Sequence, residues 1–144
     1  MTAFTNELKA VEGIDRLLAN LALPRCVASN SHIDRVRHAL TATGLLAHFD
    51  PHIYTAAMVA RGKPAPDLFL YAASQHRVPS DRCVVIEDSQ TGAAAALAAG
   101  MPVVGFVGAS HCAPGHGAVM SAAGCMAVFG RVDQLAEFLG VGFG

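Results

Sequence analysis

Val84-Val85-Ile86-Glu87-Asp88-Ser89, followed at once by Gln90-Thr91-Gly92, is the most informative stretch of this chain. An apolar run of strand length ends in two adjacent carboxylates, and a serine and a glycine then lead into a helix rich in alanine. Adjacent carboxylates repel each other, and an ion pair or a metal ion relieves that repulsion. Such hard oxygen ligands suit Mg²⁺, which keeps its other positions for water and phosphate. The stretch therefore predicts a magnesium site at the carboxyl end of a buried strand.

Two upstream segments add groups that bind phosphate. Lys63 lies in Arg61-Gly62-Lys63-Pro64-Ala65-Pro66-Asp67, where the two prolines stiffen the loop. Ser29 and Ser31 offer hydroxyls after another short apolar strand, in Val27-Ala28-Ser29-Asn30-Ser31. Together with the two carboxylates, these residues predict a combined site for magnesium and phosphate.

The composition indicates one domain and excludes several partners. The chain has 144 residues, of which 53% are hydrophobic and 15% charged, and its net charge is −1. It has no basic patch that could neutralise a nucleic-acid backbone, and no apolar segment long enough to span a membrane. We see no signal peptide in the polar N-terminus and no Cys-x-x-Cys pair among the four cysteines. We therefore expect a cytoplasmic protein with free thiols, and the sequence leaves the oligomeric state open.

Strand and helix patterns alternate along the chain. Strands are expected over residues 25–28, 53–59, 83–86, 102–107 and 124–129, and helices over 8–21, 31–43, 66–76, 91–99 and 133–139. Short apolar strands separated by helices predict an α/β fold of three layers, with a parallel sheet covered on both faces. In such sheets ligands bind beyond the carboxyl ends of the strands, which is where the carboxylates, the lysine and the serines fall.

Several of these segments resemble the haloacid dehalogenase (HAD) superfamily, and more narrowly its capped branch with β-phosphoglucomutase and many sugar-phosphate phosphatases. Residues 62–69 and 85–92 are similar to the third and fourth motifs of that superfamily, and residues 27–31 to the second. Residues 95–103 are similar to the helix and strand that follow the fourth motif. The similarity runs from about Val11 to the C-terminus. It implies a Rossmann-like three-layer core with a parallel sheet.

The resemblance also implies a role for each site residue. Ser29 would donate a hydrogen bond to the transferring phosphoryl group, and the backbone N–H of Asn30 would add a second. Lys63 would neutralise charge between that group and a nucleophilic carboxylate. Asp88 would bind Mg²⁺ directly, and Glu87 directly or through water. The implied activity is Mg²⁺-dependent phosphoryl transfer, as a phosphatase or a phosphomutase, on a small phosphorylated metabolite such as a sugar phosphate.

One family motif is missing from the sequence. Members of the family attack phosphate with an aspartate in an N-terminal Asp-x-Asp-x-Thr motif. No two aspartates of this sequence are separated by a single residue. The aspartates are Asp15, Asp34, Asp50, Asp67, Asp81, Asp88 and Asp133. We interpret residues 1–10 as the remainder of a helical cap that is mostly absent, and residues 11–144 as an HAD-like core truncated before its first strand. The strands over 25–28 and 83–86 are then expected to lack a shared neighbour, and the chain is expected to be inactive alone and marginally stable.

Other interpretations of the same residues stay open. A non-catalytic remnant would bind Mg²⁺ or phosphate, or neither. A haloacid dehalogenase would share the scaffold and attack carbon without a metal, and the acidic pair Glu87-Asp88 argues against it. A dinucleotide site is not indicated, because no Gly-x-Gly-x-x-Gly opens a helix. Taken singly, the carboxylates suit a helix N-terminus and the serines suit helix caps.

The segment between residues 105 and 117 is expected to be a loop near the mouth of the site. His111 in this loop is a candidate for contact with substrate. His111, Cys112 and His116 together resemble zinc ligands, but the sequence shows no clear fourth ligand.

Overall fold

The computed structural model describes residues 1–5, 13–108 and 115–141, and within them the chain forms one parallel sheet between two layers of helices. The order of the strands across the sheet is β3-β2-β1-β4-β5-β6, and each neighbouring pair is parallel. The strands are β1 (Thr2–Thr5), β2 (Arg25–Ser29), β3 (Ile53–Thr55), β4 (Cys83–Glu87), β5 (Val103–Phe106) and β6 (Ala127–Phe129). The α/β fold with a parallel sheet is therefore confirmed.

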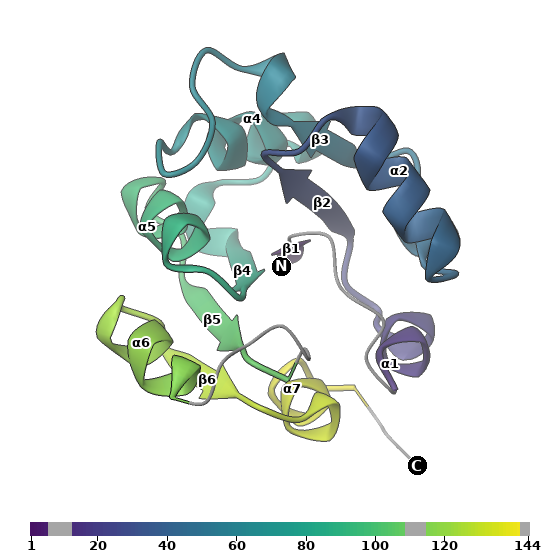
Figure 1. Ribbon diagram of the computed structural model, residues 1–144, viewed down its shortest axis with the longest axis vertical. Coiled ribbons are helices and arrows are strands. Elements are labelled where there is room, and N and C mark those ends of the chain that lie inside the picture. Colours follow the sequence, from purple (N-terminus) through teal and green to yellow (C-terminus); the bar gives the residue numbers. More distant parts are fainter. Residues whose placement is uncertain (6–12, 109–114, 142–144) are drawn as a thin grey trace.

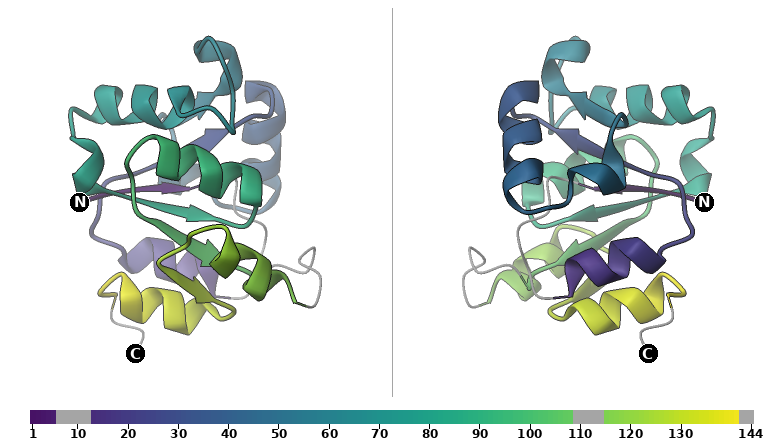
Figure 2. Two further views of the ribbon diagram at one scale, coloured as in Figure 1. Left: turned by 90° about the vertical axis from the view of Figure 1, so that its left-hand side faces the viewer. Right: turned by 90° about the vertical axis from the view of Figure 1, so that its right-hand side faces the viewer.

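Helices cover both faces of this sheet. Figures 1 and 2 show α4, α5 and α6 on one face and α1, α2 and α7 on the other. The helices are α1 (Ile14–Asn20), α2 (Ile33–Ala42), α3 (Leu46–Phe49), α4 (Asp67–His76), α5 (Gln90–Ala98), α6 (His116–Ala122) and α7 (Val132–Phe138), with 3₁₀ turns at η1 (Ala56–Met58) and η2 (Ser80–Arg82). In the described ranges, no helix is long and apolar enough to cross a membrane.

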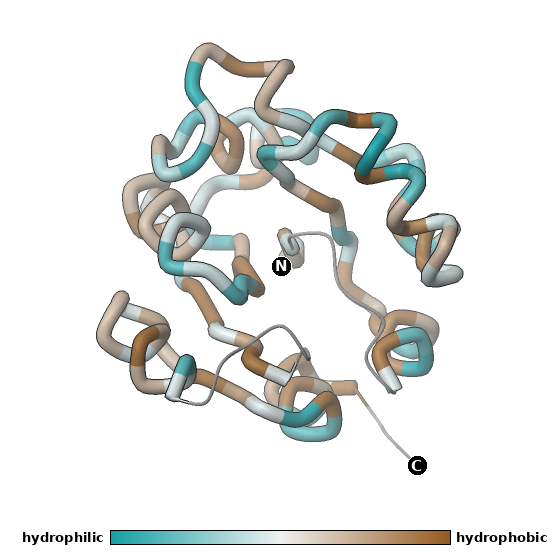
Figure 3. Tube along the Cα trace, in the orientation of Figure 1, coloured by the Kyte–Doolittle hydropathy of each residue, from teal (hydrophilic) through white to brown (hydrophobic). Residues whose placement is uncertain are grey.

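The sheet divides the hydrophobic core in two, because successive side chains of a strand point to opposite faces. In β1, Ala3 packs on the face of α1, α2 and α7, whereas Phe4 packs on the face of α4, α5 and α6. Val84 and Val85 of β4 divide in the same way. Figure 3 shows hydrophobic residues along β2 and β5 and hydrophilic ones on the outer turns of α2. Such strands, apolar on both sides, form a parallel sheet buried between helices.

The central strand β1 corrects one sequence-based expectation. Residues 2–5 are not the remainder of a cap: they form a strand that pairs in parallel with both β2 and β4, with Ala3 opposite Arg25 and Val84. All four residues are buried. The strands β2 and β4 therefore have a shared neighbour, and the unpaired backbone expected there is absent within the described residues. Threonine and phenylalanine fit a buried strand, but four residues are too few to show a period in the sequence.

Most of the other predicted elements are confirmed with small shifts at their ends. His32, not Ser31, caps α2, since its Nδ1 accepts a hydrogen bond from the Asp34 N–H at 3.2 Å. The strand predicted over 53–59 ends at Thr55 and gives way to η1. The predicted helix over 8–21 is seen from Ile14, and its earlier part lies outside the described residues.

Two helices were not predicted at all. The four-residue helix α3 is too short to give a helical period. The helix α6 begins at His116, inside the segment expected to be a loop, and only Met120 of its seven residues is buried. Its glycine and small residues give little apolar periodicity, so contacts with β5 and β6 decide this helix.

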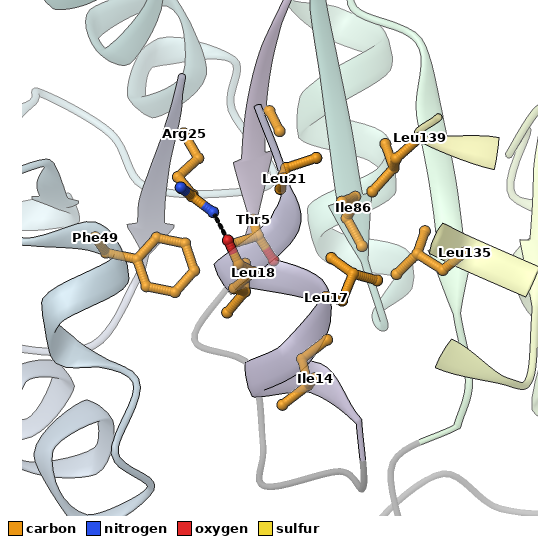
Figure 4. A pocket seen from close by; sticks show the side chains of 11 residues that line it. Thr5, Ile14, Leu17, Leu18, Leu21, Arg25, Phe49, Ile86, Leu135 and Leu139 are labelled. Carbon is orange, nitrogen blue, oxygen red and sulfur yellow. Dashed lines mark hydrogen bonds between the residues drawn. The ribbon is translucent and has the colours of Figure 1, made fainter. Parts of the chain in front are cut away.

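A small apolar cavity lies between β1 and the helices α1 and α7. It has a volume of about 20 Å³ and is lined mainly by leucines, as Figure 4 shows for Leu17 and Leu18 of α1 and Leu135 of α7. Thr5 also lines it, and its buried Oγ1 has no hydrogen-bond partner among the residues that the structure describes. A cavity of this size holds about one water molecule, which needs two or more polar partners to be ordered. The lining is apolar apart from Thr5 and Arg25. Burial of the Thr5 hydroxyl there therefore lowers the stability of the core.

Candidate functional site

The predicted site residues meet at one edge of the sheet because its strands are parallel. Thr5, the last residue of β1, lies opposite Val27 and Ile86, so β2 continues past it to Ser29 and β4 continues to Glu87. Ser29 and Glu87 therefore stand on either side of the end of β1. The carboxyl edge of the sheet brings together residues that are far apart in the sequence, as expected for this type of fold.

Lys63 links these two strand ends. Its Nζ donates a hydrogen bond to Glu87 Oε2 at 2.6 Å and another to the Ala28 carbonyl at 2.8 Å. The Lys63 side chain is 5% exposed and the Glu87 side chain is fully buried. Nζ also lies 5.0 Å from the centroid of the Phe69 ring, a favourable place for a cation. Separating the two groups of such a buried pair would leave each charge without compensation. The pair therefore holds the two side chains together.

The Glu87 carboxylate occupies a place that a glycine leaves open. A Cβ atom on Gly92 would lie 2.0 Å from Glu87 Cδ, so no other residue at position 92 fits this arrangement. The other oxygen, Glu87 Oε1, accepts from the Ser89 hydroxyl and from the Asp88 N–H, each at 3.3 Å. Ser89 Oγ in turn accepts from the Gly92 N–H at 3.1 Å and caps α5. The serine and glycine that follow the acidic pair therefore hold its first carboxylate in place.

Ser29 and Asn30 form the turn after β2. Ser29 is buried, and its Oγ accepts from the Ser31 N–H at 3.1 Å. Asn30 is exposed, and its side chain bonds to both polar groups of the Lys63 backbone. The sequence had suggested only the backbone N–H of Asn30 as a functional group. The side-chain contact joins residues 33 positions apart, so no local pattern could have indicated it.

Asp88 is half-buried at the start of the turn before α5, and its carbonyl contacts Nε2 of His116. His116 thereby places the first turn of α6 against the site, a contact that the sequence did not predict. His111 and Cys112, the predicted substrate contact and the second member of the zinc hypothesis, lie outside the described residues. In the ranges that the structure describes, no three His, Cys, Asp or Glu side chains are grouped as metal ligands.

The donor set suits Mg²⁺ better than a softer metal. Glu87 and Asp88 supply carboxylate oxygens at adjacent positions, and Mg²⁺ is bound in many proteins by one or two carboxylates with water and phosphate. The space at Gly92 already accommodates one carboxylate at the N-terminus of α5, where the helix dipole favours negative charge. The residues present therefore fit a magnesium ion that is completed by water or by a phosphate oxygen.

The three described cysteines are held as neutral thiols. Burial raises the pKa of the Cys26, Cys83 and Cys125 thiols, so each stays protonated near neutral pH. The charge of Glu87 raises the pKa of Cys125 further. A thiol attacks only as the thiolate, and these thiols behave as small apolar groups.

Several aspartates that the sequence left without a site role form surface ion pairs. Asp50 accepts from Arg37 Nη1 at 2.6 Å, and this contact lowers the pKa of Asp50. Asp15 lies 2.7 Å from His48 Nε2, and Asp133 pairs with Arg131. The Arg37–Asp50 pair joins α2 to the end of α3, and the Asp15–His48 pair joins α1 to α3. The Arg131–Asp133 pair lies at the start of α7.

Known proteins resemble this chain in sequence and in fold. A 6-phosphogluconate phosphatase of Escherichia coli (strain K12) is 32% identical over 111 residues, which cover 77% of this chain and 50% of that protein. A haloacid dehalogenase-like protein of Agrobacterium tumefaciens str. C58 superposes with a TM-score of 0.85 and 43% identity over 90% of this chain and 60% of that one. A HAD-family hydrolase of Deinococcus radiodurans R1, whose structure holds phosphate and sodium, has a TM-score of 0.78 and 38% identity over 88% and 57% of the two chains.

The chain thus spans about half the length of this curated relative and somewhat more of the solved structures. The family profile of haloacid dehalogenase-like hydrolases matches residues 2–100. Because this match covers more than half of the sequence, the chain belongs to the haloacid dehalogenase-like hydrolase family.

Proposed function

We propose that this chain forms the phosphate- and magnesium-binding half of a phosphoryl-transfer site for a small phosphorylated metabolite such as a sugar phosphate. The observation that carries the proposal is the position of Lys63. Its ammonium group joins the ends of β2 and β4 and lies between the Ser29 turn and the acidic pair. A fixed cation beside hydroxyl and amide donors is what a phosphoryl group requires.

In this proposal each donor meets a different part of the phosphoryl group. The Ser29 hydroxyl and the Asn30 N–H donate to its oxygens from the end of β2. Lys63 supplies positive charge from the end of β4, where Glu87 holds its ammonium group. Because these groups are positioned before substrate arrives, little reorganisation is needed when charge develops on the phosphoryl oxygens.

Asp88 and Glu87 would hold the magnesium ion. When bound, the ion would neutralise phosphate charge and orient the phosphoryl group. Asp88 would supply the second carboxylate. Glu87 would share its charge between Lys63 and the ion, either directly or through water.

We further propose that the chain binds phosphate without turning over a phosphate ester by itself. The sequence contains no Asp-x-Asp pair. At the end of the central strand, Thr5 turns its side chain into the apolar cavity beside α1 (Figure 4). The described part of the site therefore offers hydrogen-bond donors and the Lys63 ammonium group to a phosphoryl group but no carboxylate in the place of a nucleophile.

The similar proteins support a phosphorylated metabolite as the ligand. The E. coli relative is named for 6-phosphogluconate, and the D. radiodurans structure holds phosphate. A metal-free dehalogenase is less well supported, because it has no need of adjacent carboxylates beside a buried lysine.

The test is Mg²⁺-dependent release of phosphate from p-nitrophenyl phosphate, together with binding of inorganic phosphate and Mg²⁺ by calorimetry. We expect binding without turnover in the folded wild-type chain, and loss of Mg²⁺ binding in Asp88→Asn. Turnover that disappears in Asp88→Asn would show that another group replaces the nucleophile. Absence of both phosphate and Mg²⁺ binding would refute the proposed function.

A further inference from the structure

The Asn30 side chain binds the backbone of Lys63 from both sides. The Lys63 N–H donates to Asn30 Oδ1 at 2.9 Å, and Asn30 Nδ2 donates to the Lys63 carbonyl at 3.0 Å. One amide group thus satisfies both polar groups of a single residue, as a neighbouring strand would do. Asparagine is suited to this contact because its planar amide carries a donor and an acceptor side by side.

The loop around Lys63 is shaped to receive this amide. A Cβ atom on Gly62 would lie 2.7 Å from Asn30 Oδ1 and 3.0 Å from Ala56 Cβ, so the close approach requires glycine. The Ala65 N–H donates to the Gly62 carbonyl at 3.1 Å and closes a turn around Lys63. Asn30 ties that turn to the end of β2.

Hydrogen bonds hold both the backbone and the ammonium group of Lys63 in place relative to Ser29. The Lys63 backbone is bound to Asn30, which follows Ser29, and Nζ is bound to the carbonyl of Ala28, which precedes it. A lysine side chain has many rotamers, and anchoring both ends removes most of that freedom before a ligand arrives. The hydroxyl of Ser29 and the ammonium group of Lys63 are thereby held in one fixed relation.

We propose that Asn30 is a positioning residue: its side-chain amide fixes the Lys63 backbone and so keeps the Lys63 ammonium group directed at the phosphate site. This inference rests on the proposed function for its purpose, although the positioning itself can be measured without any ligand. It differs from the role of the Asn30 N–H, which every residue except proline could fill.

The first experiment uses the fact that the chain has only two lysines, Lys9 and Lys63. In protein labelled with ¹⁵N-lysine, the two side-chain ammonium signals are assigned with a Lys9→Arg variant. We expect Asn30→Ala to shift and broaden the Lys63 signal and to weaken binding of inorganic phosphate by about 5- to 30-fold, the effect of losing one or two hydrogen bonds. The matched control is Asn20→Ala, which removes an exposed asparagine whose amide donates to the Arg16 carbonyl in its own helix.

A second variant tests the contact from the side of the loop. Gly62→Ala places a methyl group against Asn30 Oδ1 and should disturb the Lys63 signal in the same way. In the Asn30→Ala background the same change should have a smaller effect, because Asn30 Oδ1 is gone and the milder contact with Ala56 Cβ remains. Asn30→Asp keeps an acceptor for the Lys63 N–H and loses the donor, so its Lys63 signal should be intermediate. Additive effects of the Asn30 and Gly62 changes would overturn the inference.

The outcomes separate this inference from the proposed function. An unchanged Lys63 signal in folded Asn30→Ala would refute positioning, even if phosphate binds to the wild type. A changed Lys63 signal in Asn30→Ala, with no response of the wild type to phosphate, would refute the phosphate site and leave positioning intact. The free energy of unfolding is measured for each variant. If general destabilisation causes the change in the Lys63 signal, signals far from the site should change as well.

Discussion

At the scale of single residues, the buried pair between Lys63 and Glu87 is the main constraint on the site. Both side chains are shielded from water and lie 2.6 Å apart. The energy of such a pair depends on both charges being present, because each one alone is poorly solvated. Breaking the pair is therefore expected both to lower the stability of the domain and to disturb the site.

We predict that Lys63→Met lowers the free energy of unfolding by about 3–5 kcal/mol, since it leaves Glu87 charged and buried. Urea denaturation checks this value. The double variant Lys63→Met/Glu87→Gln should recover much of the loss, because it removes the stranded charge. The matched control is Arg131→Met, which breaks an exposed pair with Asp133 and should lose less than about 1 kcal/mol. Equal losses for Lys63→Met and Arg131→Met would contradict this account.

At the scale of secondary-structure elements, two opposing demands act at Gly92 of α5: the helix favours alanine, and the Glu87 carboxylate needs the space that glycine leaves. Alanine is ordinarily better than glycine inside a helix by about 0.5–1 kcal/mol. At Gly92, however, a Cβ atom would meet the Glu87 carboxylate at 2.0 Å. The helix therefore keeps an unfavourable residue so that the carboxylate can approach its first turn.

We predict that Gly92→Ala destabilises the protein by at least about 2 kcal/mol, because a buried charged group has to move. Gly117→Ala is the control: its Cβ would be 3.8 Å from Val128 Cγ1, an ordinary contact, and it should stabilise α6 by up to about 1 kcal/mol. Thermal unfolding of the two variants should give midpoints that move in opposite directions. A rise in both midpoints would show that Glu87 does not need the space at Gly92.

The strand β1 carries the hydroxyl of Thr5 into an apolar cavity, where it has no hydrogen-bond partner within the described ranges 1–5, 13–108 and 115–141. We predict that Thr5→Val raises the free energy of unfolding by about 1 kcal/mol, because it removes an unpaired buried polar group at nearly constant volume. In the control Thr43→Val the lost hydroxyl donates to Ala39 at 3.0 Å, so that change should be neutral or destabilising. Destabilisation by Thr5→Val would mean that its hydroxyl is satisfied by an internal water.

At the scale of the whole molecule, the edge of the sheet opposite the site holds a cluster of aromatic rings. The His76 ring lies 4.9 Å from the His52 ring and close to Phe4 and Tyr54. Its Nε2 is buried, and no described residue forms a hydrogen bond with it. Burial, and then the charge of His52, lower the pKa of His76 below its usual 6.5. The folded protein therefore holds this imidazole in its neutral form more strongly than the unfolded chain does.

This difference predicts a loss of stability in mild acid. Above pH 6.5 the histidine is neutral in both states and has no effect. As the pH falls below 6.5, the unfolded chain takes up a proton before the folded one does, so the free energy of unfolding decreases. Urea midpoints between pH 8 and pH 5 should fall for the wild type and fall less for His76→Phe. Asp50, with its lowered pKa, stabilises the fold above pH 3.8 and loses that effect only at lower pH, so it does not interfere.

The sequence by itself determined the parallel α/β architecture and named most of the residues that meet in the candidate site. Apolar runs at β2, β4 and β5 and the residues that end α2 and α5 are local signals, so their positions could be predicted closely. Ser29, Lys63, Glu87 and Asp88 could be named because they belong to local motifs next to those strands. The carboxyl edge of a parallel sheet then brings such residues together in any fold of this class.

Only the tertiary structure decided which groups pair within the site and which strand fills the centre of the sheet. β1 is too short to show a pattern and is defined by its pairing with β2 and β4 on both sides. The contact of Asn30 with Lys63 and the space that Gly92 leaves for Glu87 join residues through space, and single-sequence patterns carry no record of such contacts. The physical reason is the same in each case: a hydrogen bond or an ion pair depends on distance in the folded chain, whereas a sequence pattern records only which residues share one strand or one helix.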